Sequence, residues 1–245
     1  MPRLIALILS LCVAASASGK TIDEDVQFYL NVLGEPNPRL QASEFEMLSA
    51  MGLSDPRLFD AVEKRLLADV EPVRTIHLEK NRVAWYFRAL GFSGQSKYEA
   101  TLSRYTEDRT YRNYAIAAQR ELPQYARWNP IISDRSSFDP KLSDDANRLM
   151  NMLRADDPLL HRVAAKRAFL TQQSAPVVAD RLAELLRASY PKAQDAESEE
   201  NAGWLINALS RVALDRYTPL LQEIAKQAPS QKLRLRAQSV LDRAR

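Results

Sequence analysis

The chain has 245 residues, with 34 Lys or Arg against 31 Asp or Glu, so its net charge is only +3. This near balance gives no electrostatic reason to expect a nucleic-acid partner. A single cysteine, Cys12, excludes a disulfide framework and zinc sites built from thiolates. Glycine is scarce, and Asn-Gly turns, Asp-Gly turns and alternating Val/Ile/Thr runs are absent, so the composition predicts an all-α protein.

The first 17 residues predict an export signal. Arg3 supplies a positive charge, residues 4–14 are apolar apart from Ser10, and residues 15–17 (Ala-Ser-Ala) fit the small-residue cleavage pattern. We therefore expect cleavage before Ser18 and a periplasmic or secreted protein of bacterial type. The apolar run is shorter than the roughly 20 residues of a membrane span, so an integral membrane protein is not expected; an uncleaved N-terminal anchor is the alternative.

Start and stop signals predict about eleven helices after the signal. Thr21 with Glu24 forms a capping box, and Asp55 and Asp157 each stand before a proline in the first helical position. A longer helix is expected to begin at Pro72 and end at Gly91. The last three helices are expected at about 202–212, 216–228 and 231–244.

Two stretches lack helical periodicity. Residues 192–200 are polar and acid-rich, which predicts a loop. Between Trp128 and Lys141, prolines, serines and aspartates favour a connection. We place this connecting segment at 129–141, between an N-terminal half of helical repeats, 18–128, and a C-terminal half, 142–245, which together form one continuous solenoid.

The two halves resemble each other in order. Residues 55–65 recur in similar form at 157–167, and residues 84–90 recur at 203–209, which aligns Trp85 with Trp204. Tyr98 and Leu102 fall on Tyr217 and Leu221 at the same spacing as the tryptophans. Self-similarity in fixed order is the sequence signature of stacked helical repeats.

Residues 230–241, with the run Leu-Arg-Leu-Arg-Ala, resemble the second helix of a HEAT-type repeat, and residues 217–225, with Pro219, resemble the first. Weaker matches lie at 157–168 and 112–118. The resemblance covers about two thirds of the mature chain, and the equivalent of Pro219 is Ala100. It implies a HEAT-like or armadillo-like α-solenoid, an α-α superhelix of antiparallel helices, that acts as a non-catalytic scaffold and binds a protein partner.

The sequence carries no motif for a cofactor, a metal or a catalytic group. The only histidines, His77 and His161, stand far apart, and the acidic cluster at 195–200 lacks the central glycine of a calcium loop. The alternative to a scaffold is an envelope enzyme acting on glycan, or a protein that binds an anionic polymer. The enzyme would need a cleft with a buried carboxyl group of raised pKa as its general acid.

Partner-binding candidates are basic or aromatic. Trp85 and Trp204 are expected to pack in the core, whereas the aromatic pair nearer the connecting segment forms either a contact patch or a plug between the halves. The basic candidates are expected to line one groove that holds an acidic peptide or an anionic polymer; the alternative is an ordinary charged helix face. The candidate residues are Arg112, Lys232, Arg234, Arg236, Tyr125 and Trp128.

Overall fold

The computed structural model describes residues 20–243. The export signal predicted for residues 1–17 lies outside this range. All regular elements of residues 20–243 are helices, which confirms the prediction of an all-α fold. Among these residues, no helix combines the length and the apolarity that a membrane span requires.

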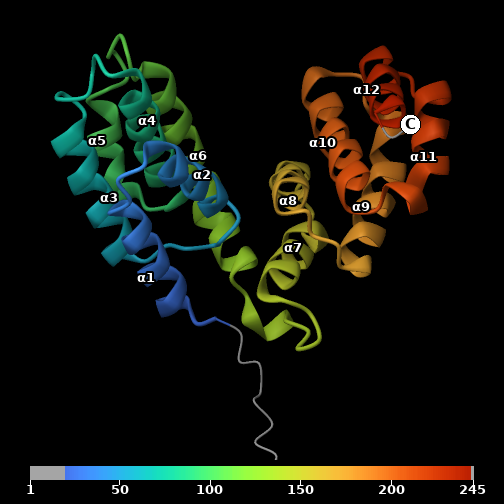
Figure 1. Cartoon of the computed structure of the whole chain (residues 1–245), viewed down its shortest axis with the longest axis horizontal. Helices are drawn as coiled ribbons and strands as arrows, with labels where there is room; N and C mark the ends of the chain where they lie inside the picture. Colours follow the sequence, from blue (N-terminus) through green and yellow to red (C-terminus); the bar gives the residue numbers. More distant parts are fainter. Residues whose placement is uncertain (1–19, 244–245) are drawn as a thin grey trace, which may run out of the picture.

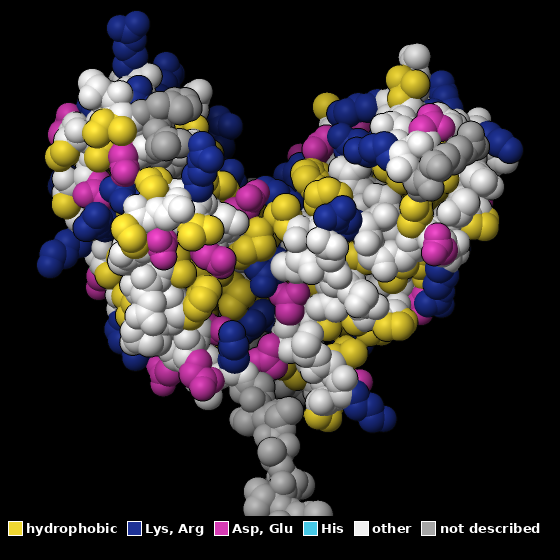
Figure 2. Space-filling model, viewed as in Figure 1, with side chains coloured by type: hydrophobic (Ala, Val, Ile, Leu, Met, Phe, Trp, Pro, Cys, Tyr) yellow, Lys and Arg dark blue, Asp and Glu magenta, His cyan; other side chains and the backbone are white. Residues whose placement is uncertain are grey.

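The helices form two lobes that are joined at one end (Figure 1), and the space-filling view shows a V-shaped notch between them (Figure 2). In the described residues, each lobe contains six α-helices. The first lobe holds α1 (Ile22–Leu33), α2 (Pro38–Leu48), α3 (Pro56–Asp69), α4 (His77–Phe92), α5 (Glu99–Ser103) and α6 (Arg112–Ile132). The second holds α7 (Asp144–Arg154), α8 (Pro158–Thr171), α9 (Pro176–Ser189), α10 (Ala196–Val212), α11 (Leu214–Gln227) and α12 (Gln231–Asp242). Three 3-10 turns, η1 (Ser96–Tyr98), η2 (Arg135–Ser137) and η3 (Tyr190–Lys192), complete the elements.

Side chains cap several helices where the sequence predicts them. Thr21 and Glu24 form the expected capping box at the start of α1. Asp55 and Asp157 accept hydrogen bonds from the first free N–H groups of α3 and α8, and Ser230 does the same for α12. These groups have no partner inside the helix, so each cap fixes where the helix begins.

The helix expected from Pro72 starts later, at His77. The backbone at 70–75 forms turns instead. Arg74 holds them in place, because its guanidinium pairs with Glu71 at 2.7 Å and with Asp108 at 2.9 Å. Asp108 lies just before α6, so tertiary ion pairing overrides the local start signal at Pro72.

Within the acid-rich stretch at 192–200, where a loop was expected, residues 196–200 are helical and form the start of α10, whereas residues 193–195 remain outside any helix. Asp195 caps α10 in a capping box with Ser198, and Glu197 and Glu199 stand in its first turn. Acidic side chains are favourable there because the N-terminal end of a helix carries partial positive charge.

Helix α6 runs through Pro123 and Pro130 as far as Ile132, so the connection between the lobes covers residues 133–143. Both prolines are exposed, and water can hydrate the carbonyl groups that they leave without a donor. Asn129 anchors the end of the helix, since its side-chain amide donates to the carbonyl groups of Leu53, Phe92 and Ser93.

The second lobe repeats the architecture of the first. The contacts α1–α2, α1–α3, α2–α4, α3–α4, α4–α6 and α5–α6 recur as α7–α8, α7–α9, α8–α10, α9–α10, α10–α12 and α11–α12. Helices α2 and α3 begin with Pro38 and Pro56, and their counterparts begin with prolines 120 positions later. The lobes are therefore two versions of one six-helix arrangement.

This correspondence corrects part of the sequence alignment. The match of residues 55–65 to 157–167 equates α3 with α8, whereas the contacts equate α3 with α9 and α2 with α8. The match of Trp85 to Trp204 agrees with the contacts. The match of Tyr98 to Tyr217 also agrees with the contacts. The Tyr98 hydroxyl donates to Asp60 of α3, and the Tyr217 hydroxyl donates to Asp180 of the corresponding helix α9.

The correspondence extends to a polar contact inside each lobe. Gln41 of α2 donates its side-chain amide to Val32 O at 3.0 Å and Leu33 O at 2.9 Å, at the end of α1. His161 of α8 stands in the corresponding place, and its Nε2 lies 2.6 Å from Ala155 O at the end of α7. Each side chain satisfies carbonyl groups that a helix end leaves free.

His161 should make the fold sensitive to acid. Burial lowers the pKa of His161 below its usual 6.5, so the folded state favours the neutral ring. Its contribution to stability is complete above pH 6.5 and is lost as the pH falls through the lowered pKa. We expect His161→Gln, which copies Gln41, to reduce the drop in Tm between pH 8 and pH 5. Thermal unfolding at both pH values checks this; an unchanged drop contradicts it.

Candidate functional site

A cavity of about 250 Å³ lies where the lobes meet at the base of the notch. Helices α2, α4 and α6 line it from the first lobe, and α8 and α10 line it from the second. Figure 2 shows hydrophobic side chains beside charged ones where the two lobes approach each other. We call this space the interlobe cavity.

Trp85 and Trp204, which the sequence comparison equates, both line the interlobe cavity, one from each lobe. Both are half-buried rather than fully packed in the core as expected. Each already has a cation over its ring: the Arg88 guanidinium lies 5.2 Å from the centroid of Trp85, and Lys166 Nζ lies 6.0 Å from that of Trp204. The cavity therefore has an indole in each wall, with one face of each covered by a cation.

Three more aromatic rings form a buried layer beside the tryptophans. Phe92 and Tyr125 have ring centroids 4.9 Å apart, and Tyr125 and Trp128 have theirs 5.1 Å apart. The Trp128 indole N–H donates to Asp157 at 2.7 Å, which links α6 to the start of α8. Tyr125 and Trp128 are only 3 % and 4 % exposed, so they are buried residues and offer no contact patch.

Glu121 is an acidic residue in the wall of the interlobe cavity. Burial raises its pKa above the usual value, and the charge of Arg88, whose Nη2 lies 3.0 Å from Glu121 Oε1, opposes the rise. Among the described residues, Glu121 Oε2 and Arg88 Nε are buried without a hydrogen-bond partner. A buried carboxyl group with an unused oxygen is able to bind or donate a proton.

The other two glutamates of the cavity also face basic groups. Glu46 of α2 pairs with Lys166 of α8 at 2.6 Å, across the junction. Glu200 of α10 lies 3.7 Å from Lys232 and 3.8 Å from Arg236. All three glutamates of the cavity are therefore at least partly neutralised.

Arg162 differs from the other basic residues that line the cavity. Arg88, Lys166 and Arg167 each pair with a carboxylate. The side chain of Arg162, on α8, is half-buried, and no hydrogen bond or ion pair joins it to another residue of the range 20–243. Among the four basic residues that line the cavity, Arg162 is thus the one whose charge has no carboxylate partner within the described range.

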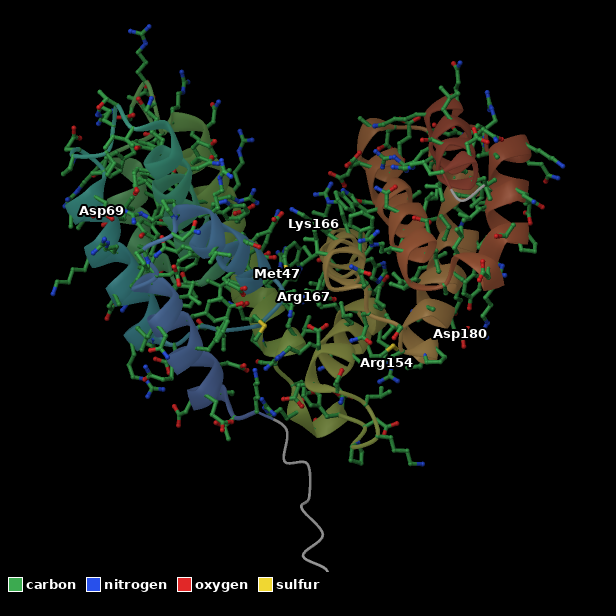
Figure 3. The ribbon with its side chains drawn as sticks, in the orientation of Figure 1. Met47, Asp69, Arg154, Lys166, Arg167 and Asp180 are labelled. Carbon is green, nitrogen blue, oxygen red and sulfur yellow. The ribbon has the colours of Figure 1, made fainter. Side chains whose placement is uncertain are left out.

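A second, wider cavity of about 910 Å³ lies beside the interlobe cavity, and Met47 and Arg167 line both. Arg167 separates the two, donating to Met47 O at 3.4 Å and pairing with Asp145 at 2.8 Å. Figure 3 shows Met47, Lys166 and Arg167 where the lobes approach most closely. At the wall of the second cavity, the buried pair Asp25–Arg148 joins α1 to α7.

The basic residues predicted to share a groove are spread over both lobes. Arg112 begins α6 in the first lobe, whereas the other three lie on α12. Arg234 donates to Ala228 O and Pro229 O, and so supports the end of α11. Lys232 and Arg236 flank Glu200 and so reach the rim of the interlobe cavity.

Sequence reasoning assigned Trp85 and Trp204 to the core and gave no role to Arg88, Glu121 or Arg162. The sequence signal at the tryptophans was their equivalence between the halves, and the structure brings this equivalent pair to one cavity. Within residues 20–243, no cluster of His, Cys, Asp and Glu has the arrangement of a metal site. No protein-family model matches this chain, and searches of the curated proteins and of the solved structures find no significant match.

Proposed function

We propose that this chain is an exported, non-catalytic helical-repeat scaffold of HEAT-like type that binds a protein partner in the cell envelope. The observation that carries the proposal is the pair of half-buried tryptophans in the walls of the interlobe cavity. Tryptophan, tyrosine and arginine dominate the binding energy of protein interfaces when they line a pocket at the interface centre. Here both tryptophans and several basic residues surround one pocket.

The interlobe cavity has a size compatible with a protein partner. Its volume of about 250 Å³ lies below the range of roughly 300–1,000 Å³ that is usual for small-molecule pockets. A space of this size suits one or two side chains of a partner that makes further contacts on the walls of the notch.

The interlobe contacts favour binding because they hold the walls in place beforehand. Lys166–Glu46, Trp128–Asp157 and Asp25–Arg148 all join the lobes. The buried apolar side chains of both lobes also form one connected cluster. A preformed site loses less conformational entropy on binding than a mobile one does.

The test is crosslinking and co-purification of the tagged protein from its native envelope, read by mass spectrometry. We expect one stoichiometric protein partner. Trp85→Ala and Trp204→Ala should each weaken its binding about thirtyfold, the effect of losing a contact of about 2 kcal/mol. Tyr114→Ala is the matched control, because Tyr114 is 39 % exposed on α6 and does not line the cavity.

Two results would count against this proposal. A folded protein that recovers no partner contradicts the scaffold. If the partner binds both tryptophan variants as tightly as it binds Tyr114→Ala, the partner does not contact the interlobe cavity.

A second candidate function, an envelope enzyme acting on glycan, is supported by the raised pKa of Glu121 in a cleft with aromatic walls. It ranks second because Arg88 pairs with Glu121 and favours its charged form, and because the other two glutamates of the cavity also face basic groups. Glycoside hydrolysis usually needs a second free carboxylate. Release of soluble fragments from purified cell wall separates this candidate from the scaffold.

A further inference from the structure

The charges of the interlobe cavity select among partner side chains. Four basic residues line it, against three glutamates. The glutamates all face basic groups of the same chain, whereas Arg162 has no such partner among the described residues. A partner group that enters the cavity therefore meets an unsatisfied positive charge.

A positively charged guest is disfavoured at both tryptophans. Cations attract aromatic rings, and a lysine or arginine of a partner would be expected to stack on Trp85 or Trp204. Arg88 and Lys166 already lie over these rings. A further cation would lie close to a like charge, and each glutamate of the cavity already faces a basic group of the same chain.

We propose that the interlobe cavity receives an acidic side chain of the partner polypeptide, which pairs with Arg162 while apolar neighbours of that side chain pack against the two tryptophans. This inference rests on the proposed function. The guanidinium group suits a carboxylate because it offers parallel N–H donors in a planar fork.

The position of Arg162 on α8 supports this arrangement. Leu159 and Val163 line the cavity beside it, and Lys166 follows one turn later. A carboxylate at Arg162 thus lies next to apolar surface that can hold the flanking side chains of the partner. Among the described atoms, Glu121 Oε2 is left without a hydrogen-bond donor, and a backbone N–H of the partner could supply one.

The test begins with a random dodecapeptide library displayed on phage and selected on the immobilised protein. Selected peptides are then synthesised, and their affinities are measured with the protein and its variants. We expect sequences in which Asp or Glu adjoins large apolar residues. Changing the acid to its amide, or Arg162 to Gln, should each weaken binding at least tenfold, and the two changes together should do little more than either alone.

Arg154→Gln is the matched control, because it removes the same charge from an exposed place on α7, on the side away from the first lobe (Figure 3). It should change the affinity less than twofold. Loss of binding with Arg154→Gln equal to the loss with Arg162→Gln overturns the inference, since the effect is then one of net charge.

The outcomes separate this inference from the proposed function. The selected peptides could instead be neutral or basic, and their binding could require Trp85 and Trp204 but be unaffected by Arg162→Gln. That result overturns the inference of an acidic guest and is consistent with the proposed scaffold function. If the selected peptides bind independently of both tryptophans, or if selection yields none, the cavity is not a peptide site, and both the inference and the proposed contact fail.

Discussion

Asp25→Ala is expected to lower the free energy of unfolding by about 3–5 kcal/mol, because it leaves Arg148 charged and buried without its partner. Asp25 and Arg148 are 4 % and 5 % exposed, and their ion pair joins α1 to α7. Urea denaturation measures the effect. The lost pair should loosen the junction of the lobes, so partner binding should weaken as well.

Asp23→Ala is the matched control for this prediction. Asp23 lies on the same helix and pairs with Arg57 at 2.5 Å, but 78 % of its side chain is exposed. An ion pair in water is worth about 0–1 kcal/mol, so the control should be nearly neutral. The double variant Asp25→Leu with Arg148→Met should recover most of the lost stability, since well-packed apolar side chains replace a buried ion pair at little cost. Equal losses for Asp23→Ala and Asp25→Ala would refute the explanation.

Gly94→Ala is expected to destabilise the protein by about 2–5 kcal/mol, from a strained backbone and a steric clash together. Gly94 has φ +65°, and an added Cβ would lie 2.5 Å from Ala126 N and 2.7 Å from Tyr125 C in α6. The glycine thus lets the end of α4 touch the backbone of α6. Because α4 carries Trp85 and Arg88 while α6 carries Glu121, the same variant should also disturb the interlobe cavity.

Gly34→Ala is the control for Gly94. Gly34 has φ −86°, which other residues adopt readily, and its added Cβ would have only Asn31 O within reach, at 3.3 Å. We expect a change below about 1 kcal/mol. Urea denaturation of both variants settles the comparison. A Gly94→Ala protein as stable as Gly34→Ala would show that α4 and α6 separate easily at this point.

Helix starts were predictable where a single side chain decides them. Thr21, Asp55 and Asp157 cap their helices as expected, because capping depends on a few consecutive residues. The start expected at Pro72 failed because it depends on a distant partner. At Pro72, the ion pair of Arg74 with Asp108 keeps the backbone in turns, and no local pattern contains that information.

The register of the repeat was harder to predict for the same reason. Asp-Pro recurs at 55–56 and 157–158 because it suits the start of any helix, and it therefore aligned α3 with α8. The lobes instead correspond by packing, which places α3 with α9. The tryptophans of α4 and α10 were aligned correctly. The cavity that the two tryptophans share was not predicted, because the similarity of two sequence halves does not show which helix faces of the two lobes pack together.

The junction of the lobes has a consequence for how such a chain can arise and change. Glu46 meets Lys166, and Met47 meets Arg167, and the partners in both contacts stand 120 positions apart, at equivalent places of the two lobes. Contacts between equivalent positions are those found at the two-fold axis of a dimer of identical chains. In a dimer of two identical halves, the residue at the position of Glu46 would face its own copy. Two glutamates or two lysines at this position would repel each other. Joining the halves in one polypeptide, as after gene duplication, lets each half mutate separately and so permits opposite charges at the axis.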